Sequence, residues 1–112
     1  MTIKADNSSG LIAVGSTDTT VLNNTSNGRW TVKSISLHDH SGSGDTVDLF
    51  KSSDATSAAA ERIDQIVLAA NETKQVVFVP VEIPSGYYLI ANATTGARVN
   101  TEAVYTARDG AS

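Results

Sequence analysis

The sequence has no cysteine among its 112 residues. Disulfide bonds and thiolate metal sites are therefore excluded, and so is a cysteine nucleophile. The serine residues show no Gly-x-Ser-x-Gly elbow, and no histidine is placed beside one of them by a recognisable pattern. Stability must come from packing, within the chain or between chains, and nucleophilic catalysis is disfavoured.

Positive charge is also scarce, with 8 Lys and Arg against 12 Asp and Glu and a formal net charge of −4. The basic residues are scattered singly from Lys4 to Arg108, whereas phosphate binding needs clustered ones. No apolar run approaches the length of a membrane span, and Met1–Asn7 contains no apolar segment of a secretory signal. We expect neither nucleic acid nor membrane as a partner, and synthesis in a cytoplasm without export.

Aromatic residues make up 5% of the chain, which leaves little for a sugar-binding platform. Glu61, Asp64 and Glu72 offer carboxylates, but nothing fixes the separation that a glycosidase pair needs. No phosphate-binding glycine loop is present. We therefore expect no enzymatic activity and no cofactor.

An apolar content of 40% is ordinary for a folded chain of this length. We expect a single domain over residues 1–112, with polar arms at Met1–Ser9 and Thr106–Ser112. The Ser52–Ala60 segment is expected to be a loop, with a helical turn that Ser57 could cap.

The stretch from Trp30 to Leu37 is the longest β-branched and apolar run in the first half, and turn-forming clusters bound it on both sides. Its apolar residues change parity midway, from Trp30 and Val32 to Ile35 and Leu37. Such a change indicates either a bulge near Lys33-Ser34 or a strand that is covered on both faces. Both interpretations make this a central strand.

Short apolar or alternating runs recur every eight to twelve residues, separated by turn signals. Further strands are expected at residues 11–14, 19–22, 45–51, 62–68, 74–79, 87–91 and 99–105. Pro80 and Pro84 indicate an edge strand or a corner around Val81–Ile83, because proline cannot donate to a ladder. The pattern predicts an all-β fold, a single antiparallel β-sandwich of about eight strands, either jelly-roll or immunoglobulin-like.

Two of these runs, Val76–Val79 and Tyr87–Ala91, are apolar at both parities. One face of a small sandwich sheet normally meets water, so the second apolar face needs a cover. A neighbouring subunit would provide it, and loops or a terminal arm would be the alternative. The interface candidates are Val77, Val79, Tyr88, Ile90 and Trp30.

Trp30 has two further interpretations. As the sole tryptophan, at the start of a central strand, it is expected to be a core anchor. An exposed Trp30 with Tyr87 or Tyr88 beside it would instead suggest a carbohydrate-binding surface or a contact with a partner.

His38 and His40 are weak metal-ligand candidates. Residues two apart on a strand point to the same side, so both imidazoles could reach one ion. No third ligand is fixed by spacing, and polar side chains at a strand end beside a flexible loop explain the pair better than a metal site does. We expect no metal site.

The order of motifs resembles that of small all-β virion proteins of tailed bacteriophages, a group that includes capsid decoration (cement) proteins and tail or neck accessory proteins. The resemblance runs from Thr19 to Tyr105, through Trp-Thr-Val-Lys-Ser-Ile-Ser-Leu, Thr-Val-Asp-Leu-Phe, Ile-Val-Leu-Ala-Ala-Asn-Glu-Thr and Ile-Pro-Ser-Gly-Tyr-Tyr-Leu. It implies a non-enzymatic virion protein assembled in the host cytoplasm. Implied partners are the major capsid protein, other virion subunits and further copies of this chain.

Within that resemblance, a capsid decoration protein that stabilises the shell through subunit contacts is the first hypothesis. A carbohydrate-binding or host-recognition module of a tail or fibre is the alternative, and a neck or tail adaptor is the third possibility.

Overall fold

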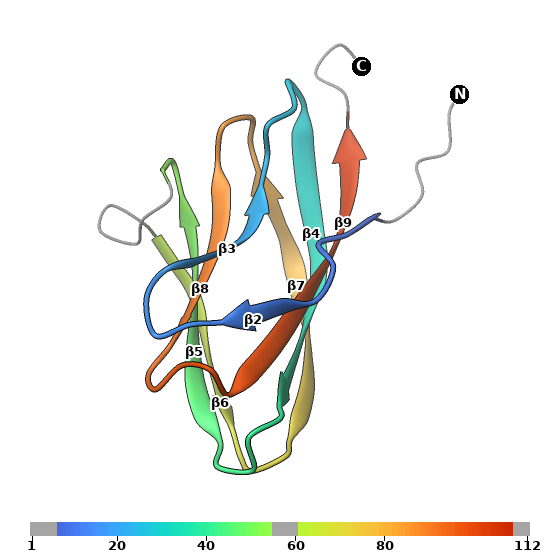
Figure 1. Ribbon diagram of the computed structural model, residues 1–112. Coiled ribbons are helices and arrows are strands. Elements are labelled where there is room, and N and C mark those ends of the chain that lie inside the picture. Colours follow the sequence, from blue (N-terminus) through green and yellow to red (C-terminus); the bar gives the residue numbers. More distant parts are fainter. Residues whose placement is uncertain (1–6, 55–60, 109–112) are drawn as a thin grey trace.

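The computed structural model describes residues 7–54 and 61–108, without the side chains of residues 61, 77–80 and 108. In the described part the chain folds into nine strands that form two antiparallel sheets (Figure 1). No helix within that part is long and apolar enough to cross a membrane. The predicted all-β sandwich is confirmed, with nine strands where about eight were expected.

The strands, in chain order, are β1 Asn7–Ser8, β2 Ile12–Val14, β3 Thr19–Asn23, β4 Arg29–Asp39, β5 Asp45–Ser52, β6 Glu61–Leu68, β7 Thr73–Ile83, β8 Tyr88–Ala93 and β9 Val99–Arg108. One sheet has the order β1-β9-β4-β7, with β2 also paired to β9, and the other has the order β3-β8-β5-β6. From β2 onward, each connection passes between the sheets except that from β5 to β6.

The strand β4 is central, as predicted, because β9 and β7 pair with it on its two sides. Its register against both neighbours shifts between Val32 and Ser34. Of the two alternatives that the parity change left open, the bulge near Lys33-Ser34 is therefore confirmed. It lets Val32 and Ile35, which differ in parity, both point into the core, where each is fully buried.

The core lies between the sheets and is built from alternating apolar positions of the strands. In β5, Val47 and Leu49 are fully buried, whereas Thr46 and Asp48 between and beside them are partly exposed. This is the period-two pattern expected of a strand with one face on a core.

The two expected arms are shorter than predicted. Residues Asn7–Ser8 pair with β9, and β9 itself continues to Arg108, because Arg29–Thr31 of β4 extend the ladder that far. The remaining parts of both arms, at residues 1–6 and 109–112, lie outside the described residues, and so does the expected helical turn after Ser57.

Candidate functional site

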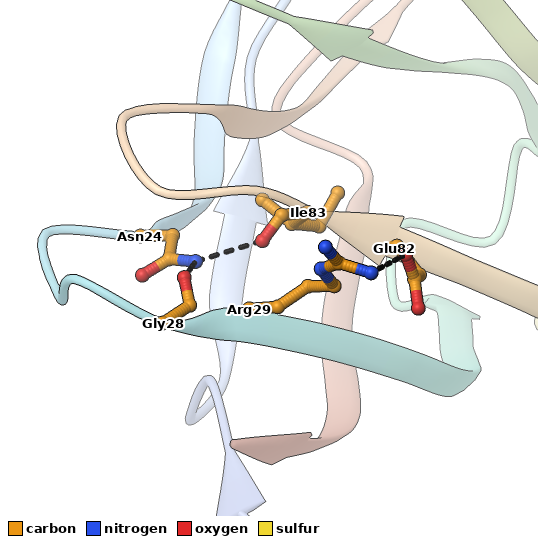
Figure 2. A network of polar contacts seen from close by, with 5 residues as sticks. All are labelled: Asn24, Gly28, Arg29, Glu82 and Ile83. Carbon is orange, nitrogen blue, oxygen red and sulfur yellow. Dashed lines mark hydrogen bonds and ion pairs between the residues drawn. The ribbon is translucent and has the colours of Figure 1, made fainter. Parts of the chain in front are cut away.

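The loop that joins β3 to β4 is organised by Asn24, whose side chain is fully buried. Its Nδ2 donates hydrogen bonds to the carbonyl oxygens of Gly28 at 3.1 Å and Ile83 at 2.7 Å (Figure 2). Its Oδ1 accepts from the backbone N–H and the hydroxyl of Ser26 at 3.1 and 2.6 Å. One amide thereby ties this loop to the end of β7.

The opposite end of β4 is organised by Asp39, whose side chain is also fully buried. Its Oδ1 accepts from the backbone N–H and the hydroxyl of Ser41 at 3.0 and 2.6 Å. Its Oδ2 accepts from the backbone N–H groups of Gly44 at 2.8 Å and Asn71 at 2.9 Å. The carboxylate thus joins the β4–β5 loop to the β6–β7 turn.

These donors lower the pKa of the Asp39 carboxyl well below its ordinary value. The hydroxyl of Ser41 is the largest cause, and the N–H groups of Asn71, Ser41 and Gly44 add to it, while burial acts in the opposite direction. Hydrogen bonds to the charged form outweigh desolvation here. Asp39 is therefore a structural anion and is unsuited to proton transfer near neutral pH.

The two histidines flank Asp39 but do not converge on it. His38 and His40 are exposed, and Nδ1 of His38 lies 2.6 Å from the hydroxyl of Thr73. The described residues contain no group of three His, Asp or Glu side chains able to hold a metal ion. In that part of the chain no third side chain joins the two histidines to form a metal site.

Trp30 lies at the margin of the core, where it is partly buried against the core cluster. Its ring stacks on Tyr105, with centroids 4.6 Å apart and an interplanar angle of 26°. Tyr87, by contrast, lies under Nζ of Lys51, 5.9 Å from the ring centroid. The aromatic ring that stacks on Trp30 is therefore Tyr105. It is neither Tyr87 nor Tyr88, the two tyrosines whose presence beside Trp30 would suggest a carbohydrate-binding surface.

Tyr88 and Ile90 lie on the face of β8 that points away from the core. Leu89 and Ala91 belong to the core cluster, so Ile90 between them faces outward. Ile90 is nevertheless 0% exposed, whereas Tyr88 is partly exposed. This corrects the interface prediction for Ile90, because a side chain with no exposed surface offers none to a partner. Tyr88 stays a prediction.

Val77 and Val79 lie in β7, and their side chains are outside the described part of the structure. Among the described strands β7 pairs with β4 alone, so it is an edge strand, one of the two alternatives that Pro80 and Pro84 indicated. Whether a partner covers the two valines stays a prediction.

The two sheets end in edge strands on two opposite sides of the sandwich. A turn over residues 69–72, closed by the bond from the Glu72 N–H to the Ala69 carbonyl at 3.1 Å, joins β6 to β7, so these two edges share one side. The opposite side is bordered by β1 and β2, which both pair with β9, and by β3 of the other sheet. Each side has one large exposed apolar residue among those described, Leu11 at 72% before β2 and Val67 at 60% in β6.

Sequence reasoning missed the two buried polar residues that organise the ends of β4. The signal was present as Asn24-x-Ser26-x-Gly28 and Asp39-x-Ser41-x-Ser43, in which a serine two residues after Asn or Asp closes a local turn. Only burial distinguishes these two residues from the many other Asn, Asp and Ser residues of the chain.

No protein-family model and no curated protein matches this chain. Among solved structures, the fold is similar to that of a subunit of Bacillus endospore appendages, described as disulfide-linked pili, with a TM-score of 0.57, 13% identity, and coverage of 96% of this chain and 87% of that one. A pentameric capsid protein from metagenomic phage sequences gives a TM-score of 0.48 at 19% identity, covering 97% of this chain and 70% of that one. The K3 adhesin domain of Lys-gingipain from Porphyromonas gingivalis gives 0.41 at 17% identity, covering 76% and 59%.

Of these three, the appendage subunit shares the fold with this chain. At its low identity the likeness concerns the fold alone.

Proposed function

We propose that this protein is a structural subunit of a bacteriophage particle, a decoration protein that stabilises the shell through contacts with the major capsid protein and with copies of itself. The observation that carries the proposal is the strand order, β2-β9-β4-β7 against β3-β8-β5-β6. This order fits a jelly roll, an architecture of viral capsid and lectin domains. The motif order from Thr19 to Tyr105, with its resemblance to phage virion proteins, adds support.

Several features of the sandwich favour a protein that acts by binding other subunits through its surface. Both of its sides are bordered by edge strands, and Leu11 and Val67 present apolar surface on opposite sides. Edge strands can pair with another chain through their backbone groups. A protein that binds the assembled shell but not its free subunits lowers the free energy of the shell by mass action. No catalytic step is part of this proposal.

The proposal is tested on particles produced by the genome that encodes this chain. Density-gradient purification followed by quantitative mass spectrometry should find the chain at a fixed ratio to the major shell protein. Stripping it should lower the melting temperature of the shell, and adding back the purified protein should restore it. Absence of the chain from purified particles would overturn the proposal.

A glycan array with the isolated protein separates the decoration role from the host-recognition module. Saturable binding of one sugar class, lost on Trp30→Ala or Tyr88→Ala but kept on Thr73→Ala, would favour the module. A tail or neck adaptor would instead appear in the particle fraction with a stoichiometry far below that of the shell protein.

A further inference from the structure

We propose that copies of this protein join side by side, with β3 of one copy pairing against the N-terminal half of β6 of the next. This inference rests on the proposed function, because it describes how such a subunit would contact its own kind. It specifies the edges that meet, their relative direction and the charged residues that select them.

The strand order makes this pairing antiparallel. Each strand of the sheet β3-β8-β5-β6 is antiparallel to its neighbour, so its two edge strands, β3 and β6, run in opposite directions. A second copy placed alongside in the same orientation presents its β3 antiparallel to β6 of the first. Antiparallel strands need no rearrangement of the flanking loops to continue a sheet.

The two edge strands also have stretches that lie at the same level of the sheet. Three rows of paired residues cross the whole sheet from β3 to β6. They place Thr19 level with Asp64, Thr20 level with Arg62, and Leu22 level with Glu61. Residues 19–22 of β3 therefore lie level with residues 61–64, the N-terminal half of β6. Towards the other end of β6, Nζ of Lys74 donates at 2.7 Å to the carbonyl of Val67. Lys74 thus protects the half of the edge that β3 does not need.

The charges of the two edges are complementary. Between residues 7 and 28 Asp18 is the single charged residue, and it lies just before β3. On β6 the side chain of Arg62 is 59% exposed, 3.9 Å from Asp48. In the joined copies Asp18 lies diagonally across from Arg62 on the same outward face, within reach of a long side chain.

Pairing of like edges lacks this complementarity. Asp64 is level with Leu49 and Ala91, which face the core, whereas Arg62 is level with the outward residue Ile90. The register shift in β6 thus turns Asp64 away from the face of Arg62. Residues 7–28 supply no cation, so two β3 edges would bring together only the carboxylates of Asp18.

The consequence is a heterologous contact, in which one edge meets a different edge of the next copy. Such contacts close into rings or continue as filaments, whereas like-edge contacts end at a dimer. Because the chain has no cysteine, no disulfide bond links the copies.

A charge-reversal cycle tests the pairing by sedimentation velocity of the full chain. Asp18→Arg and Arg62→Asp should each weaken self-association at least about tenfold, because each places like charges across the contact. The double variant should recover most of the wild-type affinity. Glu102→Arg, on the other sheet beside Ser8, is the control and should leave association unchanged. Single reversals without effect, or a double variant no better than the singles, would overturn the inference.

Cysteine cross-linking tests the symmetry, since the wild-type chain has no thiol to interfere. Thr20 and Arg62 are directly level, so Thr20→Cys mixed with Arg62→Cys should give one disulfide-linked dimer on oxidation. The double variant T20C/R62C should give a ladder of multimers, and neither single variant alone should cross-link. Dimers from one single variant would mean a two-fold contact and would overturn the inference.

The outcomes separate this inference from the proposed function. A chain present on purified particles that stays monomeric in solution, without a cross-linked ladder, overturns the edge pairing and leaves the decoration role standing. A ladder from a chain that is absent from particles supports the edge pairing and removes the decoration role.

Discussion

Asn24 and Asp39 hold the two ends of β4 by the same local arrangement. Each accepts a backbone and a hydroxyl hydrogen bond from a serine two residues later, Ser26 or Ser41. Each serine hydroxyl in turn accepts a backbone N–H two residues further on, at 3.2 and 3.1 Å. The two loops differ in what the rest of the side chain does: Asn24 donates to carbonyls, and Asp39 accepts from N–H groups.

That difference predicts that Asn24→Asp destabilises the fold. A carboxylate cannot donate, so the carbonyls of Gly28 and Ile83 lose their partner and face a buried negative charge. We expect a loss of about 3 kcal/mol in the free energy of unfolding, measured by urea denaturation at pH 7. Asn23→Asp, the same chemical change at the exposed neighbouring residue, should cost less than about 0.5 kcal/mol. Equal costs at the two positions would contradict the role of the Asn24 amide.

The reciprocal change, Asp39→Asn, should lower the melting temperature at pH 7 by roughly 5–10 °C. The new amide NH2 would meet N–H groups that now donate to the carboxylate. Because the folded-state pKa of Asp39 lies below its unfolded value, the stabilisation is complete above the unfolded pKa and is lost as pH falls through the folded one.

This gives the pH dependence of the wild type relative to D39N. The stability difference should be constant from about pH 7 to pH 5 and should shrink below about pH 4, near the ordinary pKa of aspartate. Urea denaturation of both proteins between pH 7 and pH 2 measures it. A difference that grew on acidification would contradict the assignment.

Gly96→Ala and Gly86→Ala form a matched pair, because both glycines have positive φ, at 84° and 82°. A Cβ at Gly96 would lie 2.5 Å from the backbone N of Ser16, whereas a Cβ at Gly86 meets nothing within 4 Å. Gly86→Ala should cost about 1 kcal/mol from backbone strain alone. Gly96→Ala should cost about 2 kcal/mol more, since one of two packed loops must move. Thermal unfolding of both variants gives the difference.

The stacked pair of Trp30 and Tyr105 should show a coupling of about 1 kcal/mol in a double-mutant cycle with Trp30→Leu and Tyr105→Leu. This coupling comes from the contact between the two rings, in addition to the burial of each ring by itself. The free energies come from urea denaturation followed by circular dichroism, because W30L removes the only tryptophan and its fluorescence. Additive losses would mean that each ring packs independently against the core.

The sequence was sufficient for the order and type of most strands. In β5 the alternation of Val47 and Leu49 with polar residues fixes which face is buried. In β4 the parity change between Val32 and Ile35 left a bulge as one of two alternatives, and the register shift decided for it. Such patterns are local, because side chains alternate with a period of two wherever a strand has one face on a core. They say nothing about which strand is the neighbour.

The sequence also determined that no disulfide holds the chain together, since it contains no cysteine. Only the tertiary structure decided that Asn24 and Asp39 are buried and that Ile90 faces away from the core yet is covered. It also decided that Asp18, just before β3, and Arg62, in β6, lie at opposite edges of one sheet. Burial and edge position depend on pairings between strands far apart in the chain, and a local pattern carries no record of them.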